Sequence, residues 1–120
     1  MKVIIADDSK VMRNIIEKAL LPMGLETLHA GNGQEVLDLL ETHGQGIGVI
    51  FLDWNMPVMN GLECLESMKK NVKYQNIPVL MISTESESDK MDKATKAGAK
   101  GYLSKPFTSE ELIKFINKSI

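Results

Sequence analysis

Five short runs of strand-forming residues alternate along this chain with five stretches of helical periodicity, and this alternation constrains the fold more than any other feature. Such alternation is typical of a parallel sheet covered by helices on both faces. The expected strands are Lys2–Ala6, Glu26–His29, Ile47–Leu52, Pro78–Ile82 and Gly101–Leu103. The expected helices are Ser9–Leu21, Gly33–Glu41, Leu62–Asn71, Ser86–Ala97 and a last helix that opens at Thr108. The sequence therefore predicts an α/β fold with a doubly wound sheet.

The second expected strand, Glu26–His29, is short and polar, whereas the first, Lys2–Ala6, is almost continuously apolar. A strand buried on both faces reads as an unbroken apolar run, so the polar strand belongs at an edge. Parallel strands are joined by right-handed crossovers. These rules predict a five-stranded parallel sheet of order 2-1-3-4-5, the flavodoxin-like arrangement, whose ligand crevice lies between the first and third strands.

Apolar residues at helical spacing predict the buried face of each helix. These residues are Met12, Ile15, Ile16, Ala19 and Leu20 in the first helix, Val36, Leu37 and Leu40 in the second, Leu62, Leu65 and Met68 in the third, and Leu112, Ile113, Ile116 and Ile120 in the last. The helix Ser86–Ala97 offers little more than Met91, Ala94 and Ala97. Because a packed face is what mainly holds a helix, we expect this one to be weakly held.

Length and composition limit the class of protein. The 120 residues predict one domain, residues 1–120, and 43% of them are apolar, which is enough for a core. A net charge of −2 and apolar runs too short to span a membrane argue against nucleic-acid binding and membrane insertion. Cys64 is the only cysteine and can form no disulfide within the chain, which indicates a reducing cytoplasm. Lys2 enters a strand at once, so we expect no signal peptide. We also expect a monomer. His29 and His43 show no zinc-ligand spacing and are expected at the surface.

Side chains suited to chemistry follow four of the five strands, at the point where each strand ends. Asp7 and Asp8 follow the first strand, Asp53 the third, Ser83 the fourth and Lys105 the fifth. Since the carboxyl ends of parallel strands lie at one edge of a sheet, these five side chains should gather in one crevice. Three carboxylates, a hydroxyl and an ammonium there indicate a hard cation and a phosphoryl group.

Crowded carboxylates repel one another, and such a group usually captures a cation or keeps a proton. Oxygen ligands favour Mg²⁺, with Mn²⁺ as an alternative, over zinc. Asp8 and Asp53 can supply the carboxylates, Asp7 can act through a water molecule, and the backbone carbonyl of Asn55 can be a further ligand.

Asp53 stands at the tip of a buried strand, where a carboxylate can attack phosphorus and become an aspartyl phosphate. Such a transfer depends mainly on neutralising the phosphoryl oxygens, a task that Mg²⁺, Lys105 and the Ser83 hydroxyl would share. Pro106 follows Lys105, so the peptide bond between them is rigid and can be cis, which orients the ammonium. Each residue alone also has a structural interpretation, as a helix cap, a turn residue or a surface cation. Their convergence on adjacent strand ends favours the functional interpretation.

The motifs resemble those of the receiver domain of two-component response regulators, over the whole chain. The resemblance rests on Asp7-Asp8, Asp53-Trp54-Asn55-Met56-Pro57, Asn60-Gly61, Ser83-Thr84, Ala97-Gly98-Ala99 and Lys105-Pro106-Phe107. Several independently spaced motifs agree, so the match is specific. Within the family, Trp54 to Pro57, Tyr102 and the lack of an output domain resemble the single-domain chemotaxis regulators.

The resemblance implies that Asp53 accepts a phosphoryl group from a histidine kinase, and that Asp7, Asp8 and the Asn55 carbonyl hold Mg²⁺ beside it. It implies a signalling switch rather than an enzyme, with only intrinsic self-phosphorylation and autodephosphorylation chemistry. The output would be chemotaxis through a flagellar motor switch component. A phosphorelay intermediate that passes phosphate to a histidine phosphotransfer domain is the alternative, and a domain cut from a longer protein also stays open.

The resemblance also assigns the switch. Lys105 would pair with the phosphoryl group, and Tyr102 would swing inward as Ser83 moves toward it. That movement would link the site to the face formed by the fourth helix, the fifth strand and the fifth helix. The fourth helix is the element most free to shift, because its apolar stripe is the poorest.

Three other functions compete with this reading. A haloacid-dehalogenase-type phosphatase needs a general-acid Asp two residues after the nucleophile, where this chain has Asn55. A flavodoxin-like carrier must cradle a phosphate in its first loop, where Asp7 and Asp8 would repel it. A phosphate-independent interaction domain would have no need of all five side chains.

Overall fold

The computed structural model describes residues 1–120, apart from the side chain of Gln45. Its parallel strands are β1 (Lys2–Ala6), β2 (Glu26–Ala30), β3 (Ile47–Leu52), β4 (Val79–Ser83) and β5 (Gly101–Ser104). They form one five-stranded sheet of order β2-β1-β3-β4-β5, with β2 at an edge. The predicted fold class and strand order are confirmed.

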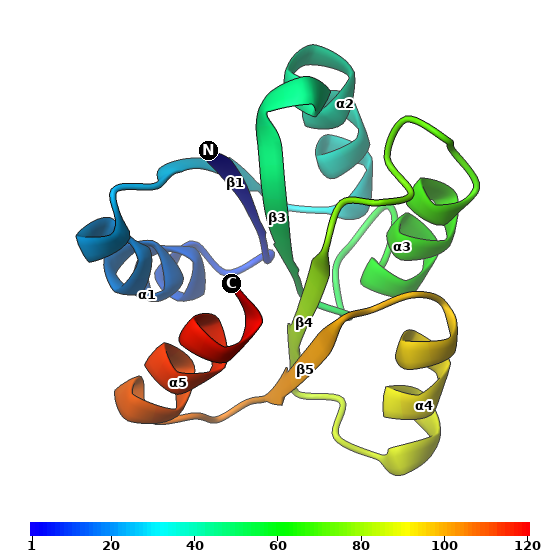
Figure 1. Cartoon of the computed structure of the whole chain (residues 1–120). Coiled ribbons are helices and arrows are strands. Elements are labelled where there is room, and N and C mark those ends of the chain that lie inside the picture. The colour runs from blue at the N-terminus through cyan, green and yellow to red at the C-terminus, as the bar shows by residue number, and fades with distance from the viewer.

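Five α-helices cover the two faces of this sheet (Figure 1). They are α1 (Lys10–Leu20), α2 (Gly33–His43), α3 (Gly61–Lys69), α4 (Ser88–Lys96) and α5 (Ser109–Ser119), with two 3₁₀ turns, η1 (Leu21–Met23) and η2 (Gly44–Gly46). Helices α1 and α5 lie on one face of the sheet, and α2, α3 and α4 lie on the other. Among the described residues, none of these helices is long and apolar enough to cross a bilayer.

Alternate residues of the central strands supply the two cores. In β1, Val3 and Ile5 pack toward α1 and α5, while Ile4 and Ala6 pack toward α2 and α3. All four side chains are buried, as expected for a strand covered on both sides. This burial fixes the register of the strand, because a slip of one residue would exchange the two faces. The register in turn fixes the position of Asp7, which directly follows the last residue of the strand.

Three helical residues predicted to be buried are exposed. Ile15 is 42% exposed, and Ile113 and Ile120 are both 48% exposed. Each helix buries a narrower face than its apolar residues suggest: α1 buries Ile16 and α5 buries Ile116. A helix turns by about 100° per residue, so Ile15 and Ile113, which adjoin buried residues, lie at the rim of the packed stripe. Ile120 lies just beyond the last residue of α5, Ser119.

The weak packing predicted for the fourth helix is confirmed. Of the described residues of α4, Ala94 alone is buried, and the cap residue Glu87 makes no side-chain cap hydrogen bond. The helix begins at Ser88 rather than at the predicted Ser86. Its end is firmer, because Gly98 takes the left-handed conformation that closes a helix, with φ of +113°.

Candidate functional site

The side chains predicted to gather at the carboxyl edge of the sheet do so. Backbone hydrogen bonds extend the strand pairing past the strand ends: the Asp7 amide donates to the Ala30 carbonyl, and the Asp53 amide donates to the Ala6 carbonyl at 2.9 Å. The Lys105 amide donates in the same way to the Ser83 carbonyl at 2.8 Å. The site is therefore built on the sheet itself, which holds its residues in place.

Three carboxylates form the centre of the site. One ligand oxygen from each of Asp7, Asp8 and Asp53 lies within 4.8 Å of the others. Asp7 and Asp53 are buried, whereas Asp8 is exposed at the mouth. Oxygen ligands at this spacing, partly open to solvent, suit a hard divalent cation that keeps some of its water.

Lys105 reaches into the carboxylate cluster from β5. Its Nζ lies 2.6 Å from Asp7 Oδ2 and 3.4 Å from Asp53 Oδ2. The Lys105–Pro106 peptide bond is cis. One cation thus faces two buried carboxylates and a third exposed one, so the cluster keeps a surplus of negative charge.

Asp53 is the least satisfied member of the cluster. Among the described residues, its Oδ1 is buried without a hydrogen-bond partner. Burial raises the pKa of Asp53 and repulsion from Asp7 raises it further, while Lys105 and the nearby Ser83 hydroxyl oppose the two only in part. A buried carboxylate oxygen with nothing to bind is a free ligand position, so these residues fit a bound cation.

Ser83 and Tyr102, the two residues that the resemblance assigns to the switch, lie on the adjacent strands β4 and β5. Ser83 is fully buried, and its hydroxyl accepts a hydrogen bond from the Glu85 amide at 3.2 Å. The Tyr102 hydroxyl donates to the Glu85 carbonyl, and burial raises the pKa of this phenol. Glu85, in the loop after β4, is therefore hydrogen-bonded to the side chains of both Ser83 and Tyr102. Asn55 lies at the rim, where its side-chain amide donates to the Thr84 hydroxyl at 3.4 Å.

Sequence reasoning missed a contact between α4 and the site. Lys90 Nζ lies 2.9 Å from Glu85 Oε1 and 5.6 Å from the centre of the Trp54 ring. Trp54 is buried beside Asp53, so this cation–π contact connects the loosely packed helix to the residue next to the carboxylate cluster. The signal in the sequence, a lysine in the first turn of the helix after β4, is too common to be informative.

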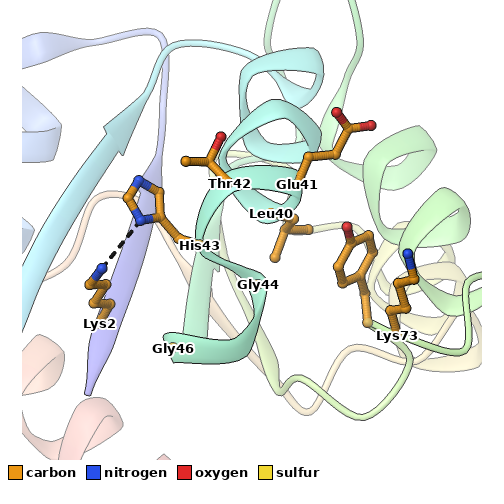
Figure 2. A pocket seen from close by; sticks show the side chains of 9 residues that line it. Lys2, Leu40, Glu41, Thr42, His43, Gly44, Gly46 and Lys73 are labelled. Carbon is orange, nitrogen blue, oxygen red and sulfur yellow. Dashed lines mark hydrogen bonds between the residues drawn. The ribbon is translucent and has the colours of Figure 1, made fainter.

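The surface has one hollow at the carboxyl end of the sheet and another at its amino end. One, of about 470 Å³, opens beside the carboxylates and is lined by Asp8, Asn55, Met56, Pro57 and Asn60. Figure 2 shows another, of about 410 Å³, at the amino end of the sheet. There the Lys2 ammonium lies 3.2 Å from His43 Nδ1, with Lys73 across the hollow. Of the three clustered carboxylates, Asp8 lines the first hollow and none lines the second, so the candidate chemistry lies at the carboxyl end.

Comparison with known proteins assigns the family. The family model of the response regulator receiver domain matches residues 3–117. The chain belongs to the response regulator receiver domain family. Among curated receiver proteins, the chain is 41% identical over 113 residues to a chemotaxis protein CheY homolog of Campylobacter jejuni, covering 93% of this chain and 86% of that one. It is 36% identical to chemotaxis protein CheY of Pseudomonas aeruginosa, covering 98% of this chain and 94% of the other.

Solved receiver structures agree with the fold. CheY4, a chemotaxis protein of Vibrio cholerae, superposes with a TM-score of 0.88 at 34% identity and covers 99% of this chain and 98% of its own. The Mn²⁺-bound form of response regulator Rcp1 superposes with a TM-score of 0.83, at 22% identity, covering 98% of this chain and 89% of that one. At that identity the second likeness shows the fold alone.

Proposed function

We propose that this protein is a phosphorylation-activated signalling switch with Asp53 as the phosphoacceptor. The observation that carries the proposal is the buried Asp53 Oδ1, which has no partner among the described residues and sits in a cluster with Asp7, Asp8 and Lys105. A free carboxylate oxygen in that position is a nucleophile with its neutralising groups already around it. Family membership supports the same assignment.

Asp7, Asp8, Asp53 and the backbone carbonyl of Asn55 would hold Mg²⁺, with Mn²⁺ as a substitute. When bound, the cation supplies positive charge for the phosphoryl oxygens during transfer. Lys105 already pairs with Asp7 and Asp53, and so has its ammonium within reach of a group placed on Asp53. Ser83 would donate its hydroxyl hydrogen to the phosphoryl group.

The transfer starts from a phosphohistidine of a histidine kinase. An Asp53 carboxylate oxygen attacks phosphorus, the new O–P bond forms, and the P–N bond breaks with its electron pair going to the imidazole, which takes up a proton. To end the signal, water attacks the same phosphorus, the P–O bond to Asp53 breaks, inorganic phosphate leaves, and the Asp53 carboxylate is restored. The protein is thus a stoichiometric acceptor with intrinsic self-phosphorylation and autodephosphorylation, not a turnover enzyme.

The signal would leave through the face formed by α4, β5 and α5. Phosphorylation adds nearly two negative charges next to Ser83 and Lys105. Movement of Ser83 toward the phosphoryl group would disturb its hydrogen bond with the Glu85 amide, and Tyr102 is bonded to the same residue. Helix α4, with Ala94 as its buried anchor, is the element that this change can shift most easily.

The output is proposed to be chemotaxis, because the curated relatives are chemotaxis proteins. The partners would be a chemotaxis histidine kinase and a flagellar motor switch component, met in the cytoplasm. A phosphorelay role differs in one measurable respect: the phosphoryl group would move from Asp53 to a histidine phosphotransfer domain. We expect no such transfer at a rate that competes with hydrolysis.

Trp54 is the only tryptophan in the sequence and lies next to Asp53, so its fluorescence reports on the site. The first experiment titrates Mg²⁺ and then adds beryllium fluoride, a mimic of the phosphoryl group on aspartate. We expect two successive changes in wild type, the second of which is lost in Asp53→Asn. Asp38→Asn removes an exposed carboxylate of α2 and should behave as wild type. A folded wild-type protein that responds to neither addition would overturn the proposed function.

A further inference from the structure

A chain of polar contacts joins α1 to the edge strand β2 and reaches the backbone of Asp7. Arg13 and Glu17 are four residues apart on α1 and therefore share a face of the helix. Thr27 and His29 are two residues apart on β2 and therefore share a face of the sheet. His29, which the sequence placed at the surface, is in fact half-buried between the other members.

Each member of this chain is bonded to the next. The His29 ring has its Nε2 3.0 Å from Glu17 Oε2 and its Nδ1 3.3 Å from the Arg13 Nε. The arginine Nε–H donates, so Nδ1 accepts and the ring proton lies on Nε2, facing the Glu17 carboxylate. Thr27 donates its hydroxyl to the same carboxylate oxygen, and these two bonds lower the pKa of Glu17. The arginine is thereby held in one orientation.

The chain of contacts ends on Asp7. Arg13 Nη1 donates to the backbone carbonyl of Asp7 at 2.6 Å. The other polar atoms of Asp7 are also bonded: its amide donates to Ala30, Oδ1 accepts from the Ser9 amide and Oδ2 pairs with Lys105. Among these contacts, the one from Arg13 is made to the Asp7 backbone, and both carboxylate oxygens have other partners.

We propose that Arg13 is a positioning residue for the metal site: by binding the Asp7 carbonyl, and being itself oriented by His29, it holds the Asp7–Asp8 segment in the geometry that binds the divalent cation. The inference rests on the proposed function, since it concerns the same cation. Groups that orient metal ligands typically contribute about 10- to 100-fold to metal affinity.

The charge of Arg13 makes the proposal easy to refute. A cation close to the site repels Mg²⁺. If Arg13 acted through its charge alone, its removal would therefore tighten metal binding. Removing a positioning contact would weaken it. The two explanations therefore predict opposite signs for the same substitution.

The test measures the Mg²⁺ dissociation constant of the full chain by isothermal titration calorimetry, well below the unfolding temperature. Arg13→Met removes both contacts and the charge, and we expect its dissociation constant to rise about tenfold. Arg13→Lys keeps the charge but cannot reach Asp7 and His29 together, and should also weaken binding. His29→Phe leaves Arg13 but removes its support, and should have the same effect to a smaller extent.

Lys10→Met is the matched control. Lys10 is an exposed cation in the first turn of α1, so its loss reports the effect of charge alone and should keep the dissociation constant within about twofold of wild type. If Arg13→Met is unstable, Arg13→Lys and His29→Phe provide the measurement.

A merely structural role for Arg13 would lower the unfolding temperature and leave the Mg²⁺ dissociation constant unchanged. Folded Arg13 variants that bind Mg²⁺ as tightly as wild type, or more tightly, would overturn this inference and leave the proposed function intact. A wild-type protein that binds no Mg²⁺ would overturn both.

Discussion

Replacing Asp53 by Asn should make the metal-free protein more stable at neutral pH. The wild-type carboxylate attracts Lys105 across 3.4 Å, which is worth about 5 kcal/mol at an effective dielectric constant of about 20. It also repels the buried Asp7 at no more than 4.8 Å, which costs about 3.5 kcal/mol or more on the same basis. The exposed Asp8 adds a repulsion of about 1 kcal/mol, because water screens it. Attraction and repulsion nearly cancel.

The cost of burying the Asp53 carboxylate then decides whether the substitution stabilises or destabilises the protein. Asp53 is 5% exposed and its Oδ1 has no partner among the described residues, a situation that costs about 1–3 kcal/mol. An amide in the same place is neutral and cheaper to bury, and Lys105 keeps its shorter contact with Asp7. We therefore expect Asp53→Asn to raise the free energy of unfolding by about 1–2 kcal/mol and the unfolding temperature by about 4–8 °C.

The gain in stability from Asp53→Asn should increase as the pH rises. The pKa of Asp53 is raised in the folded state, so the folded protein holds this proton more tightly than the unfolded chain does. Its stabilising contribution is complete below the unfolded pKa and is lost as the pH rises through the folded pKa. Asparagine does not ionise, so the difference between the two proteins should widen as the pH rises over that interval.

Thermal unfolding followed by circular dichroism, in buffer with EDTA, measures the difference. Asp38→Asn, which removes an exposed carboxylate, should leave the unfolding temperature unchanged within about 2 °C. With Mg²⁺ at a hundredfold excess over its dissociation constant, wild type gains about 2.7 kcal/mol and the order should reverse. An Asp53→Asn variant that is no more stable than wild type at pH 7 without metal would refute the reasoning that the cluster holds surplus negative charge.

Three further predictions follow from packing. Gly61→Ala should cost about 3 kcal/mol in the free energy of unfolding, measured with urea, because a Cβ there would lie 2.0 Å from the Asp53 carbonyl oxygen; an unfolding midpoint equal to that of wild type would contradict this contact. Cys64 is buried, which raises its pKa to about 12, so a thiol reagent at pH 8 should label it only as fast as the protein unfolds. Leu112→Ala should cost about 2–5 kcal/mol, whereas Ile113→Ala should cost about 0.5 kcal/mol or less, and equal losses would show that the assigned buried face of α5 is wrong.

The fold was predictable from the sequence because its strands carry a strong signal. Lys2–Ala6 and Ile47–Leu52 read as central strands because both of their faces are buried in the structure, and the polar Glu26 strand read as an edge for the opposite reason. The helix ends were less certain. A capping box at Thr108 and Glu111 is present as predicted, whereas α4, without such a cap, begins two residues later than expected.

The wrong burial predictions have a common origin, because the spacing of residues along one element does not show how that element packs against others. Ile15 and Ile113 are apolar and adjacent to buried residues, but which of two neighbours faces the sheet depends on how the helix is rotated against its partners. His29 was placed at the surface because nothing in its own neighbourhood calls for burial. Its contacts, Arg13 and Glu17, lie on another element, and contacts between elements leave no periodic trace in the sequence.

The sequence by itself determined the order of the strands and the residue types at their ends, because burial on two faces and right-handed crossovers leave few other arrangements. It therefore brought Asp7, Asp53, Ser83 and Lys105 to one edge. Only the tertiary structure decided which oxygen stays unpaired, that Lys90 covers Trp54 and that Arg13 binds the Asp7 carbonyl. Those facts depend on side-chain directions and on distances of a few ångströms between distant parts of the chain, and both are set when the helices pack onto the sheet.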